Sequence, residues 1–195
     1  MNQKSMVTGL MAAGLLAVVP IASATLIDFE GYADGANLQG VNLGGVTLYG
    51  MSGNAQIYSD DRDGASYRSP VNSVSDELGV GLNGTFDSPI TLVSLWGGDA
   101  GGDTDSWTLQ VFDAANNSLG LAASGDWGGD PYTQLTLSGA GIVRFEARWT
   151  GNVAGIAWDN LEFAAATATV PESGTLALLG LGLAGLRFAR RRKLH

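Results

Sequence analysis

Residues 143–149 read Val-Arg-Phe-Glu-Ala-Arg-Trp, and this stretch decides the fold class. Its apolar residues occupy the odd positions and its charged residues the even positions. Such alternation is the pattern of a β-strand with one face in a core and the other in water. Residues 107–111, Trp-Thr-Leu-Gln-Val, alternate in the same way. No stretch of the domain shows a sustained helical period, so we expect an all-β protein.

Short apolar runs bounded by Gly, Asn and Asp predict further strands. The segment Asp113–Ser118 has the composition of a hairpin loop. Many short strands separated by turn residues indicate an antiparallel β-sandwich. We expect its core to include Trp96, Trp107, Trp149 and Trp158. The remaining predicted strands are residues 26–30, 46–49, 90–96 and 135–137.

The last predicted strand changes register in its middle. Alternation places Ile156 and Trp158 on one face. Leu161 and Phe163 continue the pattern only if it shifts by one residue. A β-bulge at Asp159-Asn160 would bring all four apolar side chains inward.

Composition excludes several classes of protein. The 195 residues carry 19 acidic and 10 basic side chains, a net charge of −9, and no cysteine. Within residues 25–163 four arginines face 18 carboxylates, which gives −14 (four minus 18). We therefore expect no nucleic-acid partner, because binding phosphates requires a basic surface. Cysteine chemistry is excluded, and the single histidine is the last residue, His195.

The N-terminal residues have the organisation of an export signal. Lys4 precedes an apolar run over residues 10–21, and Ala22-Ser23-Ala24 follows. Small residues at Ala22 and Ala24 are typical of a signal peptidase site. The sequence predicts a signal peptide over residues 1–24, cleaved by signal peptidase before Thr25.

The C-terminal residues form a second processing segment. A linker is predicted over residues 164–170, followed by a tail over residues 171–195. The tail begins with Pro-Glu-Ser (171–173), continues as a predicted apolar helix (174–189) and ends in a basic cluster (190–195). This helix would be short for a bilayer, and its basic end would stay cytoplasmic. We therefore expect a transmembrane tail with the preceding domain outside the cytoplasm.

This tail resembles the PEP-CTERM sorting signal. The residues that carry the resemblance are Val170, Pro171, Glu172, the Gly/Leu-rich segment that follows, and Arg190, Arg191 and Arg192. The family usually has proline at the third motif position, where this chain has Ser173. The resemblance implies an exosortase as the partner. It also implies transient anchoring in the inner membrane, and then delivery to the cell surface or extracellular matrix of a Gram-negative bacterium.

The ends of the domain resemble jelly-roll domains found in PEP-CTERM proteins. The closing segment is Gly155–Phe163, and the opening segment is Ile27–Gly31 with Gly45–Leu48 downstream. In calcium-bearing domains of this kind, acidic residues near the termini share an ion. The resemblance therefore points to Glu30 and Asp159 as a candidate metal pair. Alternatively, Asp159 caps the bulge through backbone hydrogen bonds.

The segment Gly97–Asp105 is a second candidate metal site. Asp99, Asp103 and Asp105 could converge on one cation, because glycine lets the backbone curve and Ca²⁺ prefers oxygen ligands. The alternative is a solvated acidic loop, because Gly and Asp are ordinary loop residues. We expect the fold to require no cofactor, and Ca²⁺ is the ion that these residues could bind.

Residues 126–132 suggest a sugar-binding loop. Trp127 and Tyr132 lie beside Asp126 and Asp130, and sugar rings are held by aromatic faces with polar groups around them. Alternatively, Trp127 folds back and closes one end of the sandwich.

Three functions fit the sequence. The first is a non-enzymatic structural or adhesive protein of the surface or matrix. The second is a carbohydrate-binding module that recognises exopolysaccharide. The third, a secreted glycan hydrolase, has no motif to support it, because paired carboxylates arise by chance among so many acids. We expect no enzymatic activity.

Overall fold

The computed structural model describes residues 24–59, 72–76, 79–98, 104–125, 127–128, 132–151, 156–165 and 179–183. Nearly all regular structure in these residues is antiparallel β-strand, with a single helical turn at 179–183. The strands are β1 (Ala24–Ile27), β2 (Val46–Gly50), β3 (Gln56–Ser59), β4 (Asn72–Ser75), β5 (Gly81–Gly98), β6 (Thr104–Asp105), β7 (Trp107–Phe112), β8 (Ser118–Ala123), β9 (Trp127–Gly128), β10 (Tyr132–Trp149) and β11 (Ala157–Ala165).

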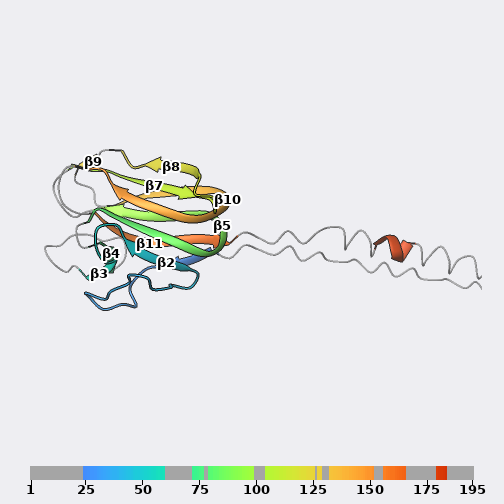
Figure 1. Ribbon diagram of the computed structural model, residues 1–195, viewed down its shortest axis with the longest axis horizontal. Helices are drawn as coiled ribbons and strands as arrows, with labels where there is room; N and C mark the ends of the chain where they lie inside the picture. The colour runs from blue at the N-terminus through green and yellow to red at the C-terminus, as the bar shows by residue number, and fades with distance from the viewer. Residues whose placement is uncertain are drawn as a thin grey trace, which may run out of the picture.

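Two 18-residue strands, β5 and β10, connect the two layers of a sandwich (Figure 1). In the first layer, residues 81–86 of β5 lie between β2 and residues 144–148 of β10, and β7 and β8 follow. In the second layer, residues 90–98 of β5 lie between β11 and residues 132–138 of β10. β4 and β3 extend this layer beyond β11, and β1 pairs with the end of β11. The predicted jelly-roll-like, antiparallel β-sandwich is confirmed.

Both long strands bend where they pass between the layers. Their register shifts twice: between Ser138 and Ile142 of β10, opposite Thr91 of β5, and between Ile142 and Arg144, opposite residues 86–89 of β5. Pro89 has no N–H to donate to a ladder, and Gly141 has a φ of 83° that a side chain would disfavour. Loss of pairing at these residues lets each strand change layer without ending.

The core lies between the two layers and is built mainly from aromatic and branched side chains. Phe86 contacts Phe145 and Phe163, with ring centroids 5.8 Å and 5.2 Å apart. Trp107 from the first layer and Trp158 from the second are completely buried. Phe145 and Ala147 are fully buried, as the alternation of residues 143–149 predicted, whereas Val143 is only half-buried because the register of β10 shifts between Ile142 and Arg144.

The predicted bulge in β11 is confirmed. Pairing of β11 with β5 shifts between Asp159 and Glu162, and Asn160 has a φ of 48°. Ile156, Trp158 and Leu161 are fully buried, and Phe163 is 6% exposed. The extra residue therefore turns both apolar pairs toward the core, as the sequence predicted.

Two predictions about buried or extended residues are wrong. Trp96 and Trp149 are half-buried rather than core, although Trp149 packs against the core edge. The strand predicted over residues 26–30 ends at Ile27. It ends there because Asp28 accepts a hydrogen bond from the Glu30 N–H (3.2 Å) and the buried Phe29 adopts a φ of 61°.

The hairpin between β7 and β8 confirms the loop predicted at Asp113–Ser118. The Asp113 carboxylate accepts hydrogen bonds from the N–H groups of Ala115 (2.9 Å) and Asn117 (2.8 Å). The hydrogen bonds from Asn117 hold the pKa of Asp113 below its ordinary value. Asn116 has a φ of 65°, a conformation that asparagine tolerates better than most residues.

Candidate functional site

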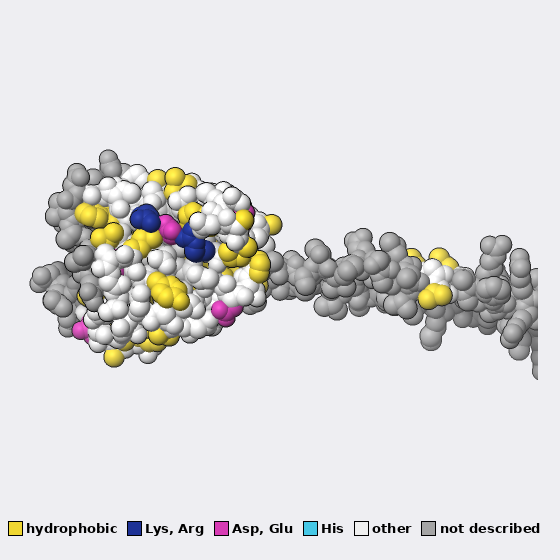
Figure 2. All heavy atoms as spheres, in the orientation of Figure 1, with side chains coloured by type: hydrophobic (Ala, Val, Ile, Leu, Met, Phe, Trp, Pro, Cys, Tyr) yellow, Lys and Arg dark blue, Asp and Glu magenta, His cyan; other side chains and the backbone are white. Residues whose placement is uncertain are grey.

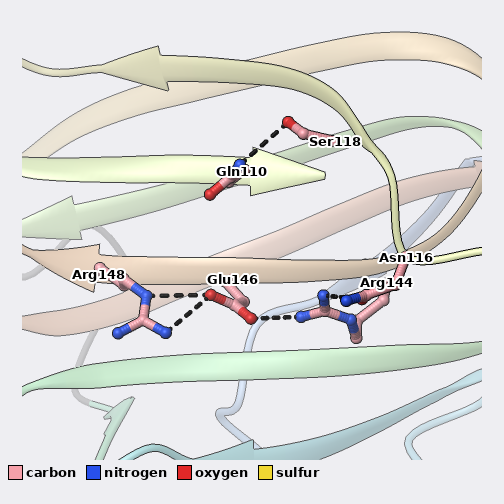
Figure 3. Close-up of polar contacts among 6 residues, drawn as sticks. All are labelled: Gln110, Asn116, Ser118, Arg144, Glu146 and Arg148. Atoms are coloured by element: carbon pink, nitrogen blue, oxygen red, sulfur yellow. Dashed lines mark hydrogen bonds and ion pairs between the residues drawn. The ribbon is translucent and has the colours of Figure 1, made fainter. Parts of the chain in front are cut away.

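The outer face of the first layer carries a polar network centred on Glu146 (Figure 3). Because Phe145 and Ala147 of β10 point into the core, Arg144, Glu146 and Arg148 point outward. Arg148 donates from Nε (3.0 Å) and forms an ion pair through Nη2 (2.9 Å), both with Oε2 of Glu146. Arg144 binds the other carboxylate oxygen through Nη1. One carboxylate thus orders two guanidinium groups.

Neighbouring strands hold Arg144 from two further sides. Its Nη2 donates to the Oδ1 of Asn116 in the β7–β8 loop. Its guanidinium carbon lies 3.7 Å from the centre of the Phe112 ring, a cation–π geometry. Beside this pair, Gln110 donates to the hydroxyl of Ser118 (3.0 Å), which joins β7 to β8 (Figure 3). The network therefore spans three strands and one loop.

The electrostatics of Glu146 favour its ionised form. Partial burial alone would raise the pKa of Glu146, but the hydrogen bonds and positive charges of Arg144 and Arg148 outweigh burial, so this pKa lies below its ordinary value. Glu146 is therefore a carboxylate at neutral pH, and with Arg144 and Arg148 it forms a network of net charge +1.

The register places five side chains in a row across this face, which we call the Glu146 row. Asn83 of β5 and Gln110 of β7 flank Glu146, and Tyr49 of β2 and Leu121 of β8 stand at the two ends. Tyr49 is 38% exposed and Leu121 is 61% exposed. Four strand-to-strand steps give the row a length of about 19 Å.

Positive charge gathers on this face. Arg144 and Arg148 are the only Lys or Arg residues in the ranges that the structure describes, and both flank Glu146. Figure 2 shows the basic side chains together on the face viewed, with an acidic side chain between them and apolar side chains nearby. The domain as a whole has a net charge of −14, so two arginines side by side make this face locally less acidic than the rest.

The first predicted metal site falls mostly outside the described residues. Asp99 and Asp103 lie in the segment 99–103, which is outside them. Asp105 belongs to β6, and its backbone pairs with Trp127 of β9. Within the described ranges, no group of three or more acidic, His or Cys side chains is arranged to hold a metal ion. A calcium site at Asp99, Asp103 and Asp105 stays a prediction.

The second predicted metal pair consists of two carboxylates, each of which accepts a backbone hydrogen bond. Oε1 of Glu30 accepts a hydrogen bond from the backbone N–H of Asn72 (3.0 Å), which ties the chain after β1 to β4. Asp159 is fully buried, and its Oδ1 accepts from the Asn160 N–H (2.6 Å) in the bulge. This hydrogen bond fits the alternative role of Asp159 as the cap of the bulge. A shared ion at Glu30 and Asp159 stays a prediction.

The predicted sugar-binding segment is not simply a loop. Tyr132 is the first residue of β10, where it pairs with Gly98, and Trp127 belongs to the short strand β9. The expectation that both aromatic residues lie in a loop is therefore wrong, because backbone pairing extends further than the turn residues suggested. Asp126 and Asp130 lie outside the described residues. The pairing of β6 with β9 nevertheless brings the two predicted ligand-binding segments side by side.

The predicted processing sites lie almost entirely outside the described residues. These are Ala22 and the sorting residues Val170, Pro171, Glu172, Arg190, Arg191 and Arg192. Ala24 begins β1 and pairs with Ala164 of β11. β11 continues to Ala165, two residues into the segment predicted as a linker. In the part of the chain that the structure describes, no helix combines the length and apolar character needed to cross a membrane.

The fold thus defines an all-β sandwich domain that precedes the segment predicted as a sorting tail. Residues 169–193 match the PEP-CTERM protein-sorting motif. The chain therefore carries an exosortase sorting signal and is an exported protein. No curated protein matches the chain.

Solved structures with a similar arrangement include adhesin and carbohydrate-binding domains. The K2 cleaved adhesin domain of Lys-gingipain is 14% identical with a TM-score of 0.48, over 72% of this chain and 99% of that one. A family 29 carbohydrate-binding module from Piromyces equi is 7% identical with a TM-score of 0.42, over 74% and 91%. A family 35 module from Clostridium thermocellum is 14% identical with a TM-score of 0.35, over 62% and 98%. At these values the similarity says nothing about ligand or activity.

The Glu146 row and its two arginines are not predicted as a site by the sequence. The alternation of Arg144, Glu146 and Arg148 with apolar residues predicts that these three side chains face solvent, but it does not predict a binding site. The partners of these residues on β2, β5, β7 and β8 follow from strand register. The usable signal was that two of the four arginines of a very acidic domain share one strand face.

Proposed function

We propose that this protein is delivered by an exosortase to the surface or extracellular matrix of a Gram-negative bacterium. There it has a structural or adhesive role without catalysis. The observation that carries the proposal is the sorting motif at residues 169–193. The domain before it is acidic and rich in glycine, which suits a hydrated matrix where divalent cations bridge carboxylates.

The positions of the domain's ends support this route. Ala24 pairs with Ala164, so the points where the predicted signal peptide and the sorting tail join the sandwich lie side by side. Cleavage before Thr25 would remove one residue of β1 and leave its pairs with β11 from Thr25 to Ile27. Removal of the tail beyond residue 170 would leave β11 complete. Both processing steps are therefore compatible with an intact domain.

Carbohydrate binding is the second candidate, and it would give the adhesive role a molecular basis. Two described features favour it: the Glu146 row, with an aromatic side chain beside ordered polar groups, and the pairing of β6 with β9, which places Trp127 next to Asp105. Exopolysaccharide would be the partner in either case.

The sorting proposal predicts the fate of a tail variant. Pro171→Ala together with Glu172→Ala is expected to abolish processing, so that the unprocessed chain accumulates in the inner membrane while the wild type leaves it. The measurement is an immunoblot of inner-membrane, outer-membrane and medium fractions of the native host. Ser173→Pro, which supplies the residue usual in the family, is the control and should be processed at least as well as the wild type. Normal release of the double variant would contradict exosortase sorting.

A further inference from the structure

We infer that the Glu146 row, together with Arg148, binds a polysaccharide that bears carboxylate groups. This inference deepens the adhesive role proposed above by naming the class of partner. Its test uses purified protein, so its outcome is independent of how the chain is sorted.

The charges of the network leave one positive unit available to a ligand. Glu146 balances one of its two arginines, and the guanidinium of Arg144 is already held by Asn116 and Phe112. Arg148 differs, because its side chain is 54% exposed. Only its Nε and Nη2 contact Glu146, and among the described residues its Nη1 has no hydrogen-bond partner. The planar edge formed by Nη1 and Nη2 matches a carboxylate.

The length and composition of the Glu146 row favour an extended sugar chain over a small anion. The row runs about 19 Å across five strands. Tyr49 at one end offers a partly exposed aromatic ring, the kind of surface on which a sugar ring packs. The side-chain amides of Asn83 and Gln110 can both donate and accept hydrogen bonds, as hydroxyl groups require. Leu121 gives the other end an exposed apolar contact.

The network also prepares the face before a ligand arrives. Glu146 holds Arg148 through two nitrogens, and β10 is a central strand between β5 and β7. A guanidinium that is already ordered loses less conformational entropy when it binds. The negative charges elsewhere in the domain oppose a bound polyanion only weakly, because physiological salt screens charges more than about 8 Å away. The affinity for a polyanion therefore depends mainly on Arg148 and the side chains of the Glu146 row.

The test compares one polysaccharide with and without its charges. The full-length chain in mild detergent is titrated calorimetrically with polygalacturonate and with its fully methyl-esterified form, at physiological salt and with EDTA present. EDTA removes divalent cations, so bridging between two acidic partners cannot produce the signal. We expect binding of polygalacturonate and about tenfold or more weaker binding of the ester, the loss that one charge-assisted contact represents. Alginate serves as a second carboxylated chain, and poly-glutamate as an acidic chain without sugars.

Two variants locate the binding on this face. Arg148→Gln keeps a polar side chain and leaves Arg144 on Glu146, and it is expected to weaken binding about tenfold. Tyr49→Ala removes the aromatic platform and is expected to weaken binding about fivefold. Leu26→Ala, at a 59% exposed position on β1, is the matched surface control and should bind as the wild type does. Melting curves of all three variants establish that the domain is folded.

Four results would overturn the inference. They are the absence of binding to both carboxylated polysaccharides, equal binding of the methyl ester, equal binding of poly-glutamate, and unchanged affinity of a folded Arg148→Gln variant. The first would leave the sorting proposal untouched, because sorting depends on the tail and not on this face.

Discussion

Replacing Gly97 by alanine is expected to lower the free energy of unfolding by about 3 kcal/mol or more. Gly97 lies in β5 with Trp158 of β11 on one side and Thr133 of β10 on the other. A Cβ atom at this position would lie 2.6 Å from Cε2 and 2.9 Å from Nε1 of the Trp107 indole. Trp107 is completely buried, so its ring cannot move aside without disturbing the packing between the layers.

The measurement is thermal unfolding of residues 25–165 followed by tryptophan fluorescence. The expected loss corresponds to a decrease in Tm of about 10 °C. Gly139→Ala is the control: it also changes a strand glycine to alanine, but its Cβ would have nothing within 4 Å. We expect the Gly139→Ala variant to melt within about 2 °C of the wild type. Equal Tm values for the two variants would contradict the packing of Trp107 on Gly97.

Asp76→Ala is expected to cost about 4 kcal/mol, because this carboxylate accepts several hydrogen bonds inside the protein. Asp76 is 2% exposed. Its Oδ1 accepts from the Val80 N–H (2.7 Å), and its Oδ2 accepts from the N–H groups of Ser52 (2.9 Å) and Gly81 (3.1 Å). The hydroxyl of Ser52 donates to Oδ2 as well. Removing the carboxylate would leave these donors without their acceptor and release the β2–β3 turn from the start of β5.

Urea unfolding of the same domain measures this loss. Asp76→Asn, which keeps one acceptor oxygen, should lie between the wild type and the alanine variant. Asp34→Ala is the matched control, because Asp34 is exposed and accepts one backbone hydrogen bond, from Ser59 (3.0 Å). We expect that control to lose about 1 kcal/mol or less. A loss at Asp76 no greater than the loss at Asp34 would contradict its role as a buried anchor.

Local periodicity predicted the strands well where one face is apolar. The alternation of residues 145–149 and the shifted register after Asp159 each depend on neighbouring residues alone, and both predictions are confirmed. The apolar run at 90–96 was misleading about Trp96, because an unbroken apolar run does not show which of its residues face the core. In the structure Trp96 is only half-buried, whereas its neighbours Leu95 and Gly97 are buried.

Long strands and cross-strand partners could not be predicted from the sequence. Residues 87–89, Asp-Ser-Pro, have the composition of a turn, yet in the structure they bend β5 between layers instead of ending it. The Glu146 row combines side chains from five strands. Tyr49 and Glu146 are 97 residues apart in the chain, and they share this row because the strand register joins both to Asn83. Such a site depends on register, which short-range patterns do not contain.

The intact mass of the protein from the envelope and medium of its native host tests the central claim most directly. The account predicts a mature chain that begins at Thr25 and has lost the tail beyond the Pro171-Glu172 motif, recovered outside the inner membrane. A mass that retains Arg190 to His195 would mean a domain that stays anchored in the inner membrane. That result would contradict exosortase sorting and delivery to the surface or matrix.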